Sequence, residues 1–159
     1  MTHLNNGDAF PNLMLDTVGS GTVSITRHLA GHHGVVLMYR GSWCPYCNAQ
    51  LAAFARANEK LDDLAIGIVA LSVDSEADAA TLVEKHRLNF PIGYGVDADK
   101  IAASTGAYVN ESPRYFQSTG FVLDPGGRVI TAVYSSGAIG RLVAEDVIGF
   151  VQYVKSKAA

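Results

Sequence analysis

The two cysteines of this chain lie close together, in the segment GSWCPYCNAQL at residues 41–51. Cys44 and Cys47 are the only cysteines among 159 residues. Two thiols at this spacing face the same side of a helix, so their sulfur atoms can reach disulfide distance with little backbone movement. The spacing therefore indicates a reversible dithiol, in which one thiolate attacks a disulfide and the second thiol releases the product.

The residues around the pair predict which thiol reacts first. The segment GVVLMYRG at 34–41 is an unbroken apolar run typical of a buried strand, and Pro45 suits the first turn of a helix. Cys44 then falls at the strand-to-helix junction, where backbone N–H groups and the helix dipole favour a thiolate. Cys47 lies deeper in the first turn. We therefore expect Cys44 to be the nucleophile and Cys47 the resolving residue.

Two other uses of the cysteines fit the sequence less well. A zinc site needs about four nitrogen or sulfur ligands, or three and an open position, and none of the five histidines has a spacing that would complete one. Packing of buried thiols is common, but a Cys-Pro-Tyr-Cys segment in a strand-helix-strand setting favours redox chemistry. The sequence predicts neither a metal nor a bound cofactor.

Composition limits the partners and the location. A net charge of −3 gives no reason to expect nucleic acid or an anionic membrane. No apolar run is long enough to span a membrane, and the N-terminal residues lack a secretory signal pattern. We expect a cytoplasmic protein, with residues 1–159 forming a single domain, because a chain of this length can bury its own core.

The pattern along the chain predicts alternating strands and helices. Helices are expected after Pro45, after Ser75, over 98–105 and at the C-terminal end. Strands are expected at 12–16, 22–26, 34–41, 65–74 and within 90–97, followed by a strand pair within 121–135. In the last helix the residues expected to face inward are Val143, Val147, Phe150, Val151 and Val154. This order implies an α/β fold, a mixed sheet with helices on both faces and the dithiol at the carboxyl end of a central strand.

Several segments resemble known families. GDAFPNLML, SITRHLAGHHGVVLMYRG and GFVLDPGGRVI follow the order and spacing of the peroxiredoxins, the alkyl hydroperoxide reductase and thiol-specific antioxidant family. YRGSWCPYC resembles the thioredoxin active-site segment, and Pro-Tyr between the cysteines is typical of glutaredoxins. Over about residues 7–155 the chain is similar to the CxxC-containing peroxiredoxin-like subgroup. The resemblance implies a thioredoxin fold with a peroxiredoxin-type N-terminal β-hairpin, and an antioxidant role in cell redox homeostasis.

The chain also departs from the peroxiredoxin pattern. Cys47 falls where that family carries its peroxidatic cysteine, Cys44 takes the place of its threonine, and Arg40 that of its proline. The arginine that the family places just before FVLD is missing, and Arg114 stands a few residues earlier. These changes replace part of a peroxide pocket with a dithiol.

The match to thioredoxin is incomplete as well. Its buried acid corresponds to Met38, and its cis-proline falls near Ser118 or Thr119. Proton transfer to Cys47 would then use water or another group, and the surface that grips an extended protein substrate would be altered.

Six further residues are expected to support the site. Arg40 can favour the Cys44 thiolate and guide an anionic substrate, and Trp43 is expected to cover one side of the dithiol. Pro45 and Tyr46 separate the cysteines, and Ser118 and Thr119 are expected to run past them.

Three functions remain open from the sequence. The first is a thiol-disulfide oxidoreductase that draws electrons from the thioredoxin or glutathione system and needs no cofactor. The second is a thiol peroxidase in which Cys47 is oxidised by a peroxide and Cys44 resolves it. The third is a redox sensor without turnover. A homodimer is compatible with the resemblance, although no apolar stripe requires one.

Overall fold

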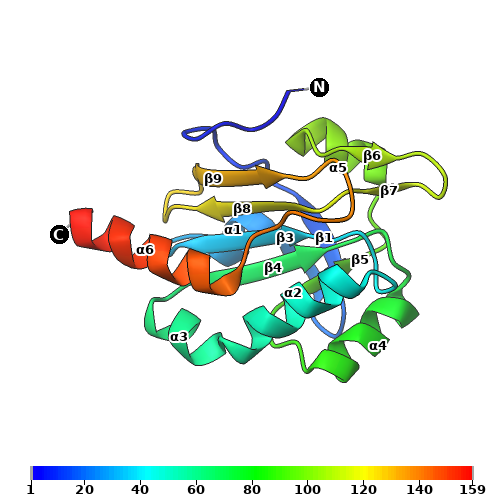
Figure 1. Cartoon of the computed structure of the whole chain (residues 1–159), viewed down its shortest axis with the longest axis horizontal. Helices are drawn as coiled ribbons and strands as arrows, with labels where there is room; N and C mark the ends of the chain where they lie inside the picture. Colours follow the sequence, from blue (N-terminus) through cyan, green and yellow to red (C-terminus); the bar gives the residue numbers. More distant parts are fainter. Residues whose placement is uncertain (1, 159) are drawn as a thin grey trace.

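A seven-stranded mixed sheet forms the centre of the molecule, in the order β2-β1-β5-β4-β3-β8-β9 (Figure 1). The computed structural model describes residues 2–158. The strands of this sheet are β1 (Met14–Thr17), β2 (Gly21–Ser24), β3 (Gly34–Met38), β4 (Gly67–Leu71), β5 (Ile92–Tyr94), β8 (Thr119–Leu123) and β9 (Val129–Tyr134). A small hairpin adds β6 (Val109–Asn110) and β7 (Tyr115–Phe116). The helices are α1 (Ile25–Leu29), α2 (Pro45–Arg56), α3 (Asn58–Asp63), α4 (Glu76–His86), α5 (Ala98–Thr105) and α6 (Ala144–Ala158).

Strand β3 has strands on both of its edges and packed side chains on both of its faces. It runs parallel to β4 and antiparallel to β8, and all of its residues are buried. Val35, Leu37 and Tyr39 pack into a core cluster with residues of α2, α4 and α6. Val36 and Met38 pack on the opposite face with residues of α1 and α5. The mixed α/β sheet with helices on both faces is thus confirmed, and the unbroken apolar run at 34–38 is explained by burial on both sides.

The N-terminal strand pair is an extension of the sheet. β1 and β2 form an antiparallel hairpin, and β1 continues the sheet by pairing with β5. Since one sheet carries both core clusters, we propose that residues 2–158 belong to one domain. Residues 1 and 159 of the predicted domain lie outside the described residues.

Helix ends follow the expected capping chemistry. The Ser75 side chain accepts a hydrogen bond from the Asp78 N–H and caps α4. Helix α5 spans the predicted residues and ends at Gly106, whose φ of 83° lies in the left-handed region that glycine tolerates. Across residues 2–158, none of the helices combines the length and apolar character that a membrane span requires.

Some sequence predictions were wrong in detail. Residues 25–26, expected in a strand, begin α1, because the Ser24 hydroxyl accepts the Arg27 N–H and caps a helix there. Strand β3 ends at Met38, so residues 39–44 form the link to α2. Val143, expected to face inward, is exposed because it precedes the first residue of α6. The hairpin β6–β7 was not predicted at all.

Candidate active site

The dithiol lies at the N-terminus of α2, directly beyond the carboxyl end of β3. Cys44 is the N-cap residue, and its Sγ accepts a hydrogen bond of 3.3 Å from the Cys47 N–H. Pro45 occupies the first helical position, where its missing N–H costs the helix no hydrogen bond. Both cysteines are free thiols. The local sequence therefore places a sulfur where a helix offers N–H donors and partial positive charge.

Arg40 contacts both sulfur atoms. Its backbone N–H donates to Cys47 Sγ at 3.4 Å, and its Nη1 lies 3.8 Å from Cys44 Sγ. The guanidinium is fixed by the Gln117 Oε1, 2.9 Å from Nε, and by the Tyr115 hydroxyl, 2.9 Å from Nη2. It also lies 4.9 Å from the ring centre of Trp43. These contacts hold a positive charge beside the Cys44 thiol.

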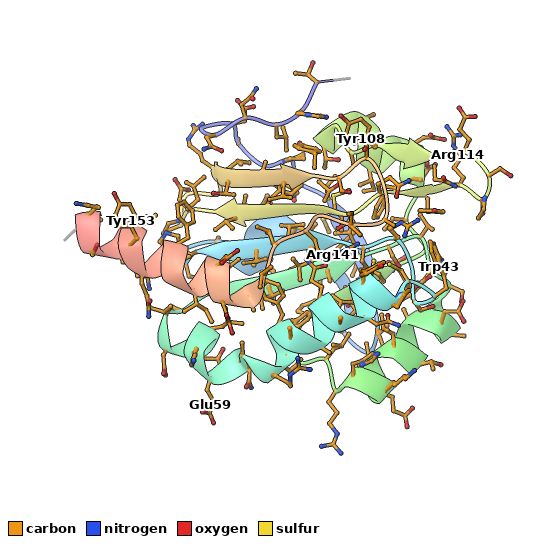
Figure 2. The ribbon with its side chains drawn as sticks, in the orientation of Figure 1. Trp43, Glu59, Tyr108, Arg114, Arg141 and Tyr153 are labelled. Carbon is orange, nitrogen blue, oxygen red and sulfur yellow. The ribbon has the colours of Figure 1, made fainter. Side chains whose placement is uncertain are left out.

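A second guanidinium reaches the dithiol from a distant part of the chain. Arg141, in the segment between β9 and α6, places Nη2 3.4 Å from Cys47 Sγ and lies 5.9 Å from the ring centre of Tyr46. Figure 2 shows Arg141 and Trp43 near the start of α2. Sequence reasoning missed Arg141, since 94 residues separate it from Cys47 and no local pattern marks it.

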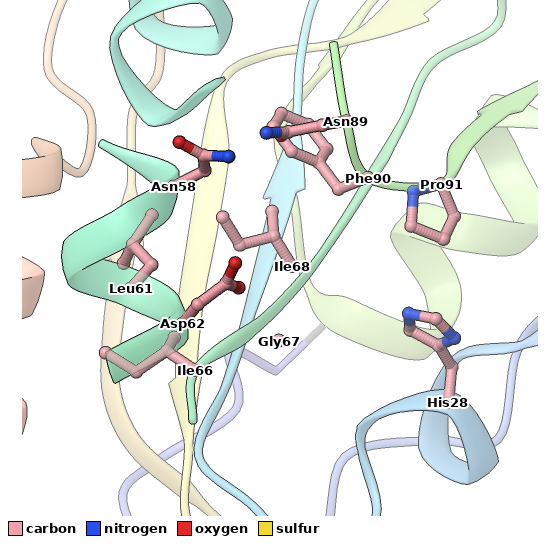
Figure 3. A pocket seen from close by; sticks show the side chains of 10 residues that line it. All are labelled: His28, Asn58, Leu61, Asp62, Ile66, Gly67, Ile68, Asn89, Phe90 and Pro91. Carbon is pink, nitrogen blue, oxygen red and sulfur yellow. The ribbon is translucent and has the colours of Figure 1, made fainter. Parts of the chain in front are cut away.

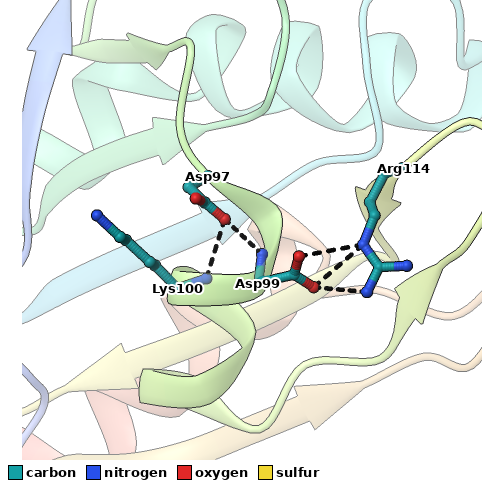
Figure 4. Close-up of polar contacts among 4 residues, drawn as sticks. All are labelled: Asp97, Asp99, Lys100 and Arg114. Atoms are coloured by element: carbon teal, nitrogen blue, oxygen red, sulfur yellow. Dashed lines mark hydrogen bonds and ion pairs between the residues drawn. The ribbon is translucent and has the colours of Figure 1, made fainter.

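Arg114 does not fill the place of the missing family arginine. Its guanidinium forms a salt bridge of 2.7 Å with Asp99 in the first turn of α5 (Figure 4). Both side chains are more than half exposed, so the pair contributes little to stability. The charges at the dithiol come from Arg40 and Arg141 instead.

The two thiols differ in acidity. Burial alone would raise the pKa of Cys44, but hydrogen bonds from the Cys47 thiol, the Cys47 N–H and Arg40, with the charge of Arg141, bring that pKa below its ordinary value. Burial, together with the hydrogen bond to Cys44, raises the pKa of Cys47 to about 11. When the pair loses one proton, the negative charge therefore lies on Cys44.

Aromatic side chains flank the dithiol. Neither cysteine exposes surface to solvent, whereas Trp43 is 55% and Tyr46 53% exposed. The Trp43 indole packs on Gly41, where an added Cβ would lie 2.2 Å from Nε1, and its ring meets Tyr115 edge to face. A substrate that reaches Cys44 must therefore displace side chains at this surface.

A buried polar cluster lies on the same face of the sheet as the dithiol. Directly beyond β3 the Tyr39 N–H donates to the Leu71 carbonyl, and the residue after Leu71 is Ser72, whose Oγ accepts the Asp74 N–H at 3.1 Å. The Asp74 carboxylate accepts the Ser42 N–H at 2.9 Å, and burial raises the pKa of Asp74. Burial also raises the pKa of Tyr39, and the charges of Asp74 and Cys47 add to that rise. Tyr39 is thus close to both groups.

Ser118 and Thr119 are buried near the start of β8 and share no hydrogen bond with either thiol. The Ser118 carbonyl accepts the Ser135 N–H, and the neighbouring Gln117 N–H donates to the Tyr108 carbonyl. Thr119 pairs with Met38 across β3 and β8. The structure therefore brings Arg40, Trp43, Pro45 and Tyr46 around the dithiol. Ser118 and Thr119 instead make backbone contacts with neighbouring strands or with the residue that follows β9.

A hollow at the far end of the sheet holds neither thiol. The hollow in Figure 3, of about 320 Å³, is lined by Ile66 to Ile68 at the amino end of β4, the opposite end from the dithiol, and by residues including His28 and Asp62. No group of three or more His, Cys, Asp or Glu side chains within residues 2–158 is placed to hold a metal ion.

A mixed sheet with two free thiols at the first turn of the helix that follows a central strand defines a thioredoxin-fold protein of the thiol oxidoreductase class. The AhpC/TSA family matches residues 6–132, so the chain belongs to that family of oxidoreductases. The predicted resemblance and the predicted enzyme class are thereby confirmed.

Individual relatives agree with this assignment. The chain is 27% identical over 145 residues to a peroxiredoxin of Treponema denticola, covering 89% of this chain and 69% of the relative. It is 25% identical over 150 residues to the thiol-disulfide oxidoreductase ResA of Bacillus cereus, covering 93% of this chain and 78% of the relative. It covers 62% of a peroxiredoxin of Aeropyrum pernix, at 26% identity over 157 residues and 94% of this chain.

Solved structures confirm the thioredoxin fold in its peroxiredoxin form. The peroxiredoxin 6 of Arenicola marina superposes with a TM-score of 0.85 at 17% identity, covering 98% of this chain and 75% of that one. The AhpC of Mycobacterium tuberculosis superposes with a TM-score of 0.81 at 20% identity, covering 98% and 96%.

Proposed function

We propose that the protein is a thiol-disulfide oxidoreductase in which Cys44 is the nucleophile and Cys47 the resolving thiol. The observation that supports this most directly is the unequal acidity of the two thiols. Cys44 has the N-cap position and the Arg40 guanidinium beside it, whereas Cys47 is held as a buried thiol. The more acidic thiol supplies the attacking thiolate at neutral pH.

The proposed exchange has two steps. The Cys44 thiolate attacks one sulfur of a substrate disulfide, forms a mixed disulfide and releases the other half as a thiolate. Cys47 then loses its proton and attacks Cys44 Sγ, which releases the second half of the substrate as a thiolate. The enzyme keeps a Cys44–Cys47 disulfide, and two electrons have passed to the substrate.

Cys47 needs a proton acceptor for the second step. We place that role on Asp74, since its buried carboxylate belongs to the polar cluster of Tyr39 and Ser72 on the dithiol side of the sheet. A carboxylate with a raised pKa is better suited to accept a proton than an ordinary one. Asp74 would take over, from the end of β4, the function of the acid that Met38 cannot provide.

The disulfide must be reduced again for turnover. A cytoplasmic thiol system of the thioredoxin or glutathione type would supply the two electrons through the same exchange chemistry. The solved yeast mitochondrial 1-Cys peroxiredoxin, which superposes with a TM-score of 0.82 at 18% identity over 98% of this chain and 78% of that one, is described as resolved via glutathione/thioredoxin systems.

Peroxide reduction is the second candidate, and the contacts of Cys47 favour it. Cys47 Sγ accepts from the Arg40 N–H and from Arg141 Nη2, donors that could also stabilise charge on a bound peroxide. In that scheme the Cys47 thiolate takes one peroxide oxygen, becomes a sulfenic acid and releases an alcohol or water. Cys44 then forms the disulfide and releases water.

Single-cysteine variants separate the candidates. Each of Cys44→Ser and Cys47→Ser is treated with a small disulfide and with a peroxide, and the adducts are identified by mass spectrometry. A mixed disulfide on Cys44 in the Cys47→Ser variant supports exchange, whereas rapid sulfenic acid on Cys47 in the Cys44→Ser variant supports the peroxidase. Retained disulfide reductase activity in Cys44→Ser would reject the exchange mechanism. In the wild-type protein, a Cys44–Cys47 disulfide that forms without turnover would leave a redox sensor.

A further inference from the structure

Exposed apolar side chains gather beside the dithiol. Trp43, Tyr46, Ile139 and Val143 are each more than half exposed. Tyr46, Ile139 and Val143 border the same groove, and Trp43 directly precedes Cys44. Single exposed apolar side chains are common on protein surfaces, whereas a contiguous group of them often marks a binding site.

The groove runs between α2 and the segment that carries Arg141. It has a volume of about 320 Å³, at the lower end for small-molecule sites, and the α2 side is lined by Tyr46, Ala49 and Ala53. Its polar side-chain groups are the Gln50 amide, the Tyr46 hydroxyl and the Arg141 guanidinium, of which only the last is charged. The Gln50 amide already donates to the Leu142 carbonyl. Arg141 donates from Nη1 to the Ala138 carbonyl and from Nη2 to Cys47 Sγ, but its Nε has no hydrogen-bond partner among residues 2–158, so Arg141 is the charged group of the groove with a donor left for a ligand.

The arginines at this site have no carboxylate partner. Within residues 2–158 the only Lys, Arg or His salt bridge to a carboxylate joins Arg114 to Asp99. Arg40 and Arg141 instead share the dithiol, which carries one negative charge when Cys44 is ionised and none once it is a disulfide. A guanidinium binds a carboxylate in preference to other common groups, because its paired N–H donors match the two oxygens.

An extended polypeptide fits this site poorly. Gln117, whose side chain binds Arg40 beside the dithiol, donates its N–H to the Tyr108 carbonyl, and the Ser118 carbonyl accepts the Ser135 N–H. These two backbone groups are not free to pair with a substrate strand. The groove volume likewise suits a small molecule rather than a protein segment.

We propose that the groove binds the apolar chain of a small substrate and that Arg141 binds a carboxylate on the same molecule. The proposal rests on the proposed function, which places the reacting disulfide of this substrate at Cys44. The substrate class is then an apolar carboxylic acid that carries a disulfide, and it is reduced to two thiols while the Cys44–Cys47 disulfide forms.

Symmetrical dithiodialkanoic acids of increasing chain length test the proposal. Their kcat/KM is compared with that of neutral amides and of diamines with the same chains. We expect the carboxylates to exceed the amides by roughly tenfold, and each methylene that enters the groove to add about a threefold to fourfold gain. The preference for carboxylates over amides should fall in Arg141→Met. It should persist in Arg114→Met, because that guanidinium pairs with Asp99 and does not contact the thiols.

A second variant tests the groove itself. Ala53→Leu fills part of it, so the ratio of kcat/KM for long chains to that for short chains should fall. Ala103→Leu, on an exposed position of α5, is the matched control and should leave that ratio unchanged. Equal rates for carboxylates, amides and diamines, or a chain-length gain that survives Ala53→Leu, would overturn the proposal while leaving disulfide reduction intact.

Direct binding gives a readout that does not depend on turnover. Trp43 is the only tryptophan, so its fluorescence can be titrated with simple alkanoates that carry no sulfur. Affinity that rises with chain length and falls in Arg141→Met supports the groove even if no disulfide is reduced. Absence of alkanoate binding would contradict the proposed ligand site. A concentration-dependent dimer that Ala53→Leu abolishes would instead show that a second copy of the chain occupies the groove.

Discussion

The Arg141 guanidinium lies 3.4 Å from Cys47 Sγ, although 94 residues separate the two in the chain. The contact places a positive charge at the less acidic of the two thiols. Because that charge lowers the pKa of Cys47 against the opposing effects of burial and Cys44, it increases the small thiolate fraction on which the resolving step depends.

Arg141→Met should therefore slow resolution. Methionine keeps an apolar side chain of similar length but removes the charge, so we expect release from the mixed disulfide to slow by about tenfold. Quenched-flow mass spectrometry would show the Cys44 adduct persisting, while the first step changes less. An adduct that decays at the wild-type rate would exclude Arg141 from the resolving step.

Arg40→Met should reduce the reactivity of Cys44. The guanidinium beside Cys44 favours its thiolate, and loss of a charge-assisted contact of this kind costs roughly tenfold in thiolate population at neutral pH. Alkylation by iodoacetamide, followed across pH in a Cys47→Ser background, should show its midpoint displaced to higher pH. Arg114→Met is the control, and an equal displacement there would point to a general charge effect.

Trp43→Ala should open access to the dithiol. Both cysteines are covered, and the indole lies beside them on Gly41. We expect bulky maleimides to label Cys44 several-fold faster in the variant, with a smaller change for iodoacetamide, because only large reagents need the space. Tyr153→Ala, an exposed aromatic on α6, is the control and should not alter labelling.

Asp74→Asn should slow the resolving step without weakening the fold at neutral pH. Burial raises the pKa of Asp74, so ionisation of its carboxyl group lowers the free energy of unfolding. This loss of stability is complete at pH values above the pKa of Asp74 in the folded state. Asparagine keeps an acceptor for the Ser42 N–H and removes the charge. The urea midpoint of Asp74→Asn should therefore match or exceed that of the wild-type protein at pH 7. The midpoint of the wild-type protein should rise relative to that of the variant as the pH falls through the pKa of Asp74 in the folded state.

The matching kinetic measurement is the pH dependence of mixed-disulfide decay. If Asp74 accepts the Cys47 proton, decay in Asp74→Asn should be several-fold slower at neutral pH and should recover at high pH, where hydroxide removes the proton. A profile identical to wild type would leave water as the acceptor.

The order of elements and the position of the dithiol followed from local patterns. Helix α5, the cap at Ser75 and the buried β3 could be predicted because capping, periodicity and apolar runs act over a few residues. The short helix α1 and the hairpin β6–β7 could not, since each is too short for its own pattern to dominate and tertiary contacts decide it.

The sequence alone determined that two thiols share the first turn of a helix after a buried strand, because that depends on spacing and on one proline. The tertiary structure decided which charges reach those thiols. Arg141, Tyr115 and Gln117 meet Cys47 and Arg40 only when β7, β8 and the segment before α6 pack beside β3. Such contacts depend on the path of the whole chain, which no short stretch of sequence records.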